Sequence, residues 1–167
     1  RPPNLIVAMD DEAFEFMGDR GERLLPGVAI VFCGVNHFCE TMIQDRPGVT
    51  GVVEIPDIKA SILLGLSLRP QANRVLVVTD NTRAGRKNRE TLERLQRNGE
   101  IPAELVFLDS GGGLSLQELS VKLATAPPNS IVYYSDFTLD RTGEILDPRE
   151  TLRQLSAGCS APIFVHA

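Results

Sequence analysis

Short apolar runs alternate with amphipathic stretches along the whole chain, which is the pattern of strands followed by helices. The apolar runs predict strands or short extended segments at 4–9, 28–33, 47–53, 75–78, 105–108, 131–134 and 163–165. Between them, apolar residues recur at helical spacing, as in Ile58, Ile62 and Leu66. No hairpin turn of the Asn-Gly type joins consecutive strands, so we expect parallel strands connected by right-handed crossovers. The sequence therefore predicts an α/β protein with doubly wound parallel sheets.

The stretch 74–95 shows most clearly where function is expected. Its run Val75 to Val78 is apolar without interruption, which is typical of a strand covered by helices on both faces. The run ends at Thr79-Asp80-Asn81-Thr82, just before a helix begins. Because open α/β sheets bind ligands at the carboxyl ends of their strands, we expect the functional residues at the strand ends.

Polar residues follow several of the other predicted strands as well. Asp10-Asp11, Asn36-His37, Asp109-Ser110, Asp136-Phe137-Thr138 and His166 all stand at such ends. Each aspartate taken alone is more simply explained as a helix cap or turn residue. Their repetition at strand ends, however, favours a crevice for a small polar ligand.

One part of the chain breaks the alternation of strands and helices. Between Asn36 and Asp57 there is no good helical pattern where the alternation requires one. Such a stretch suits a passage between two lobes. The chain also opens and closes close to predicted strands, so we expect it to be a piece of a longer protein.

Composition and charge limit the classes of function that this chain can have. The chain has 167 residues, of which 43% are apolar and 23% are charged, as in ordinary globular domains. Its net charge of −5 argues against a general nucleic-acid binder, which needs a basic surface. The basic cluster Arg83, Arg86 and Lys87 leaves two interpretations open: binding of an anionic solute, or solvation of a helix face.

The sequence offers no recognisable catalytic set. It contains neither a Gly-x-x-x-x-Gly-Lys phosphate loop nor a Gly-x-Ser-x-Gly nucleophile elbow. It has two histidines and three cysteines, and the cysteines lack Cys-x-x-Cys spacing. We therefore predict no catalytic residue, no metal site and no cofactor. Asp10-Asp11 leave a receiver-like phosphoacceptor open as an alternative, although the lysine and middle aspartate such a site needs are missing.

Several segments together resemble the type I periplasmic-binding-protein-like superfamily. The segments that carry the resemblance are 26–36, 47–52, 75–80, 135–138, 147–150 and 161–164. Within that superfamily the chain looks like the ABC-transporter substrate-binding-like sensor domains of bacterial histidine kinases and diguanylate cyclases. The resemblance covers nearly the whole chain and rests on its strand ends.

The resemblance implies a clamshell of two lobes, with the C-terminal part of the first lobe at 1–53 and the second lobe at 54–167. It implies an extracytoplasmic or periplasmic sensor domain of a membrane-anchored signalling protein, which binds an amino acid or carboxylate-like solute between its lobes and is not an enzyme. A free solute-binding protein of an ABC transporter is the alternative, and a homodimer is compatible with both. The implied ligand-binding residues are Asp10, Asn36, His37, Asp80, Asn81, Thr82, Asp136, Phe137, Thr138 and His166.

Overall fold

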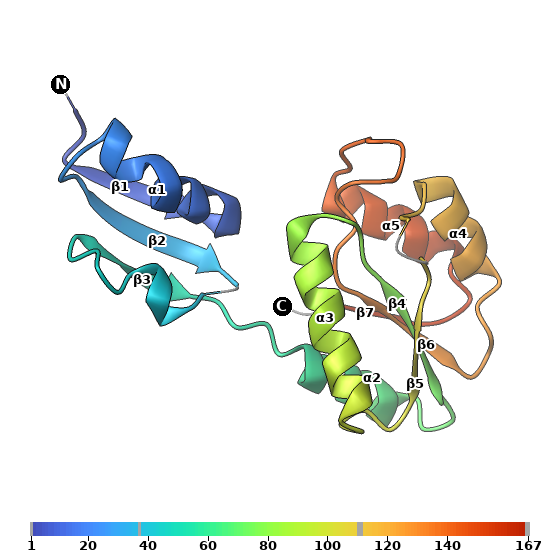
Figure 1. Ribbon diagram of the computed structural model, residues 1–167. Helices are drawn as coiled ribbons and strands as arrows, with labels where there is room; N and C mark the ends of the chain where they lie inside the picture. Colours follow the sequence, from blue (N-terminus) through green and yellow to red (C-terminus); the bar gives the residue numbers. More distant parts are fainter. Residues whose placement is uncertain (1, 37, 110–111, 166–167) are drawn as a thin grey trace. The chain divides into compact units, whose positions relative to one another are not determined.

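The chain folds into two compact units, Arg1–Pro56 and Asp57–Ala167, in a computed structural model that describes residues 2–36, 38–109 and 112–165. The sequence placed the corresponding boundary between residues 53 and 54, slightly earlier in the chain. Both units are built from parallel strands and helices (Figure 1). The predicted α/β class with parallel sheets is therefore confirmed.

The first unit is a sheet of three parallel strands in the order β1-β2-β3. These strands are β1 (Leu5–Met9), β2 (Ala29–Val35) and β3 (Val49–Val53). Helix α1 (Asp10–Leu24) covers one face of the sheet, and the 3-10 turn η1 (Glu40–Met42) lies between β2 and β3 (Figure 1). The core of this unit is small and consists of Ala8, Phe14, Ile30, Phe32 and Val35.

The second unit contains four parallel strands in the order β5-β4-β6-β7. They are β4 (Arg74–Val78), β5 (Glu104–Phe107), β6 (Ser130–Tyr134) and β7 (Ile163–Val165). Four helices accompany them: α2 (Ile58–Leu68), α3 (Arg83–Arg97), α4 (Leu116–Ala124) and α5 (Pro148–Gly158). Because β4 pairs with both β5 and β6, it lies inside the sheet, as its apolar sequence predicted.

Alternate residues of the central strands enter two separate cores. Val75 and Val77 pack with residues of α2 and α3, such as Ile62. Leu76 and Val78 pack on the opposite face with residues of α4 and α5, such as Leu155. Figure 1 shows these two helix pairs on opposite faces of the sheet. The prediction that both faces of this strand are covered is confirmed, and each fully buried aliphatic side chain contributes roughly 1.5–3 kcal/mol.

Side-chain caps define where the helices of the second unit begin. Thr82 caps α3 by accepting a hydrogen bond from the Gly85 N–H. Ser115 and Glu118, three residues apart, form a capping box at the start of α4, and Asp147 caps α5 with Pro148 in the first turn. The expectation that Asp10 or Asp11 caps α1 is wrong, since Met9 holds that position without a side-chain hydrogen bond.

Candidate functional site

The polar ends of β4 and β6 lie side by side because these strands are neighbours and run in parallel. Val78, the last residue of β4, is in register with Tyr134, the last residue of β6. The segments that follow are joined by side-chain hydrogen bonds, to which α3 contributes as well. We call Asp80, Thr82, Asn88, Asp136 and Thr138 the strand-end cluster.

Asp80 joins the two strand ends. Its Oδ1 accepts hydrogen bonds from the Thr82 N–H at 3.0 Å and the Thr82 hydroxyl at 2.6 Å. Its Oδ2 accepts from the Thr138 N–H at 2.8 Å, the Thr138 hydroxyl at 3.0 Å and the Leu139 N–H at 3.2 Å. The residue is only 3% exposed. Asp80 therefore fixes the loop after β4 against the loop after β6.

Asp136 is held differently, by a residue of α3. Its Oδ2 accepts a hydrogen bond from the Asn88 side-chain amide at 2.6 Å and another from the Ser135 hydroxyl at 3.1 Å. Asn88 and Ser135 are buried, whereas Asp136 is partly exposed. The carboxyl group is thus fixed in position while remaining accessible from outside.

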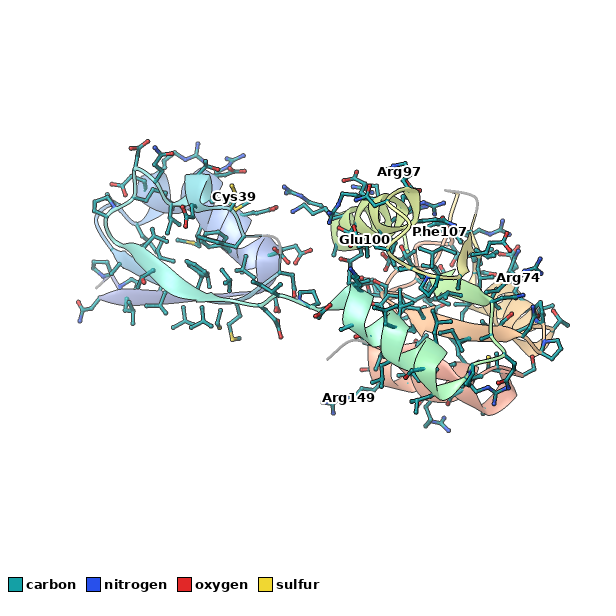
Figure 2. All side chains as sticks on the ribbon, turned by 90° about the horizontal axis from the view of Figure 1, so that it is seen from below. Cys39, Arg74, Arg97, Glu100, Phe107 and Arg149 are labelled. Atoms are coloured by element: carbon teal, nitrogen blue, oxygen red, sulfur yellow. The ribbon has the colours of Figure 1, made fainter. Side chains whose placement is uncertain are left out.

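A third aspartate stands at the end of β5 and forms an ion pair. Arg89 of α3 donates to Asp109 Oδ1 at 2.6 Å, and its guanidinium lies 4.4 Å from the centre of the Phe107 ring. Figure 2 labels Phe107 beside α3. Since the Asp109 side chain is 4% exposed, this pair anchors α3 to the end of β5 and leaves little of the carboxylate accessible.

The tyrosines at the end of β6 stay protonated at physiological pH. Burial raises the pKa of Tyr134 to about 12, and the negative charges of Asp136 and Asp80 add to this effect. Burial likewise raises the pKa of Tyr133 far above its ordinary value. Both are buried, Tyr133 in the core with α2 and α3 and Tyr134 in the core with α4 and α5, so neither is part of the surface of the strand-end cluster.

The first unit has a smaller polar cluster at the ends of β1 and β2. Asp11 Oδ2 accepts from the Asn36 N–H at 3.3 Å and from its side-chain amide at 3.5 Å. Asp10 has a φ of 69°, a left-handed conformation that is uncommon outside glycine. Gly34 has a φ of 69°, a conformation that favours glycine, and a Cβ atom there would also lie 2.8 Å from Asp10 Oδ1.

The structure brings some of the predicted ligand-binding residues together and separates others. Asp80, Thr82 and Thr138 are joined by hydrogen bonds in the second unit, with Asn81 between the first two in sequence, and Asp136, two residues before Thr138, is held by Asn88 of α3. Phe137 was expected to face a ligand, but it is 1% exposed and packs in the core beside α4 and α5. Asp10 and Asn36 belong to the sheet of the first unit, while His37 and His166 lie outside the described residues.

Sequence reasoning missed Asn88, which positions Asp136. A signal was present, because Asn88, Leu92 and Leu95 recur at helical spacing and form the buried stripe of α3. A polar residue within an apolar stripe must find a hydrogen-bonding partner in the interior. That partner is Asp136, which is distant in sequence and could not be identified from the spacing.

The division into two sheets argues against the receiver-like alternative. A receiver holds its carboxylates at the ends of neighbouring strands of one sheet, whereas Asp10-Asp11 and Asp80 follow strands of different sheets. Within the described residues, no three His, Cys, Asp or Glu side chains are grouped so that they could hold a metal ion.

None of the helices in the described part of the chain is long and apolar enough to cross a membrane.

Comparison with known proteins identified no relative. No family model, no curated protein and no solved structure matches this chain.

Proposed function

We propose that this chain is the small-molecule-binding part of an extracytoplasmic sensor domain, built on the type I periplasmic-binding-protein-like plan and belonging to a membrane signalling protein. The solute binds at the carboxyl edge of the β5-β4-β6-β7 sheet. One observation carries this proposal: Asp80 ties the polar ends of two neighbouring strands into a single fixed surface. Binding sites in open parallel sheets form at this edge.

The strand-end cluster is suited to holding a solute. Its polar groups are oriented by each other and by buried residues such as Asn88, so they do not have to be ordered when a ligand arrives. Such preorganisation lowers the entropic cost of binding. In this proposal the chain binds without transforming its ligand, and the binding event is passed to an output domain of the parent protein.

The proposal is tested by NMR titration of the full chain with a panel of amino acids and small carboxylates. We expect saturable shifts in the backbone amides of 79–82 and 135–138, accompanied by an increase in melting temperature. Shifts confined to the cavity of about 510 Å³ in the first unit, which Gly21, Leu25, Pro47 and Val49 help to line, would place the site elsewhere.

The solute-binding component of an ABC transporter is the alternative function, and the same strand-end cluster supports it. The two functions differ in what the solute does after binding: a sensor passes on a conformational change, while a carrier delivers its solute to a permease. The gene sequence following the chain distinguishes them. A transmembrane helix and a kinase or cyclase module indicate the sensor, and an immediate stop codon indicates the carrier.

A further inference from the structure

The three aspartates at the ends of β4, β5 and β6 differ in how much hydrogen-bonding capacity they have left. Asp80 is buried, and its two oxygens together accept from five donors. Asp109 is also buried and is paired with Arg89. Asp136 is partly exposed, and both of its hydrogen bonds end on Oδ2. Its Oδ1 has no partner among the described residues.

Asp136 also lacks a cation among the residues that the structure describes. Carboxylates removed from water are normally paired with a positive charge or fully hydrogen-bonded. Asp109 follows the first rule and Asp80 the second, whereas Asp136 is only partly removed from water and is held by two neutral donors. Its neighbours Asn88 and Ser135 provide neutral dipoles, so its charge is oriented without being neutralised.

We propose that Asp136 binds the positively charged nitrogen of the solute, and that this nitrogen is a primary ammonium group. The inference rests on the proposed function and specifies the ligand class. A guanidinium binds best to two free carboxylate oxygens, whereas Asp136 offers one. A divalent cation would require several oxygen ligands arranged around it. A compact N⁺–H donor matches the single accessible oxygen.

The test is a titration of the full chain with n-propylammonium chloride, sodium propionate or n-propanol, followed by ¹H–¹⁵N NMR. The three probes have similar size and differ in charge. We expect n-propylammonium to cause saturable shifts in the backbone amides of 135–138 and in the side-chain amide of Asn88. Asp136→Asn keeps an oxygen that accepts from Asn88 and removes the charge, so it should weaken this binding by about tenfold or more.

Glu104→Gln is the matched control. Glu104 is an exposed carboxylate that pairs with Arg74 at the amino edge of the same sheet, so its replacement removes one negative charge away from the proposed site. The dissociation constant for n-propylammonium should stay within about twofold of the unmodified value, which also shows that net charge alone does not explain the effect of Asp136→Asn.

The possible outcomes separate this inference from the proposed function. If propionate or n-propanol shifts the amides of 135–138 and n-propylammonium does not, the edge binds solutes but the ammonium assignment is wrong. Equal affinity of n-propylammonium for the Asp136→Asn variant also overturns it. If none of the three probes causes saturable shifts at this edge, the ammonium assignment is overturned, and the titration with amino acids and small carboxylates decides the proposed function separately.

Discussion

At the scale of single residues, the strand-end cluster separates an aspartate that holds the fold from one that is available to a ligand. Asp80 faces donors at both oxygens, so an asparagine there must turn its own NH₂ group toward other donors. We expect Asp80→Asn to lower the free energy of unfolding by about 2–3 kcal/mol. Urea denaturation measures this change. Asp136→Asn should cost much less, and equal losses in the two variants would contradict the distinction.

Ser130 provides a second contrast between side chains of the same kind. The residue is 1% exposed, and its hydroxyl oxygen has no hydrogen-bonding partner among the described residues. Because an unsatisfied buried hydroxyl is unfavourable, Ser130→Ala should leave stability unchanged or raise it by up to about 1 kcal/mol. Ser115→Ala removes the cap of α4 and should lower stability by about 1 kcal/mol. Thermal and urea unfolding of both variants would show whether the loss of stability is confined to Ser115→Ala.

At the residue scale, the sequence was sufficient to predict several residues of the site but not how they are hydrogen-bonded. Asp80, Thr82, Asp136 and Thr138 were predicted from their positions after apolar runs, and the structure joins all but Asp136 by hydrogen bonds. The sequence could not show that Asp80 is saturated while Asp136 keeps one oxygen free. Nor could it show that Phe137 turns into the core. These properties depend on hydrogen bonds between residues far apart in the chain.

At the scale of elements, the entry into α3 requires a glycine. A Cβ atom on Gly85 would lie 2.4 Å from both the backbone oxygen and Oδ1 of Asp80, and the backbone there cannot move without disturbing the strand-end cluster. We expect Gly85→Ala to lower the free energy of unfolding by about 2 kcal/mol or more. Gly158 in α5 has open space around it, so Gly158→Ala should raise stability by about 0.5–1 kcal/mol.

The measurement is urea denaturation of both glycine variants against the unmodified chain. The comparison separates steric conflict from helix propensity, because alanine favours a helix over glycine at either position. An increase in stability for Gly85→Ala would show that the loop after β4 is not held in place by Asp80.

The start of α4 predicts a pH dependence. The Ser115 backbone N–H and hydroxyl, helped by Arg141, hold the pKa of Glu118 below its ordinary value of 4.5. A carboxyl group whose pKa is lower in the folded state stabilises the fold above its unfolded value, and this contribution is lost as the pH falls through the folded value. Glu118→Gln should therefore be less stable than the unmodified chain at pH 7, with the difference closing toward pH 3.

Urea denaturation of both proteins at several pH values between 7 and 3 follows this difference. Glutamine can still reach the Ser115 N–H, so the variant isolates the effect of charge from that of the hydrogen bond. A stability difference that does not change with pH over this range would contradict the assignment.

The elements themselves were largely predictable because their signals are local. The run Val75 to Val78, the Ser115 and Glu118 pair and the Asp147-Pro148 start each act through near neighbours in sequence, and the structure confirms them. The start of α1 was harder to predict. Asp10 has the residue type of a cap, yet it adopts a left-handed conformation and Met9 holds the cap position. Its residue type alone does not predict this backbone conformation.

At the scale of the whole molecule, the two units differ in how completely they bury their sheets. In the second unit, helices cover both faces and two cores are formed. In the first unit, α1 covers one face, while the other exposes Leu5, Val7 and Met9 of β1 at 50%, 59% and 63%. Parallel sheets are stable when both faces are covered. We therefore expect the first unit not to be stable by itself.

This difference predicts how the chain behaves when it is divided at the boundary between the units. A fragment of residues 57–167 keeps both cores and all four strands of its sheet, so it should unfold cooperatively in urea and give a dispersed NMR spectrum. A fragment of residues 1–56 should lack a cooperative transition and bind a hydrophobic dye such as ANS. Replacing Val7 and Met9 with threonine should reduce this dye binding, because both side chains lie on the exposed face. A cooperative transition in the smaller fragment, or its absence in the larger one, would show that the units depend on each other in a way that their separate cores do not reveal.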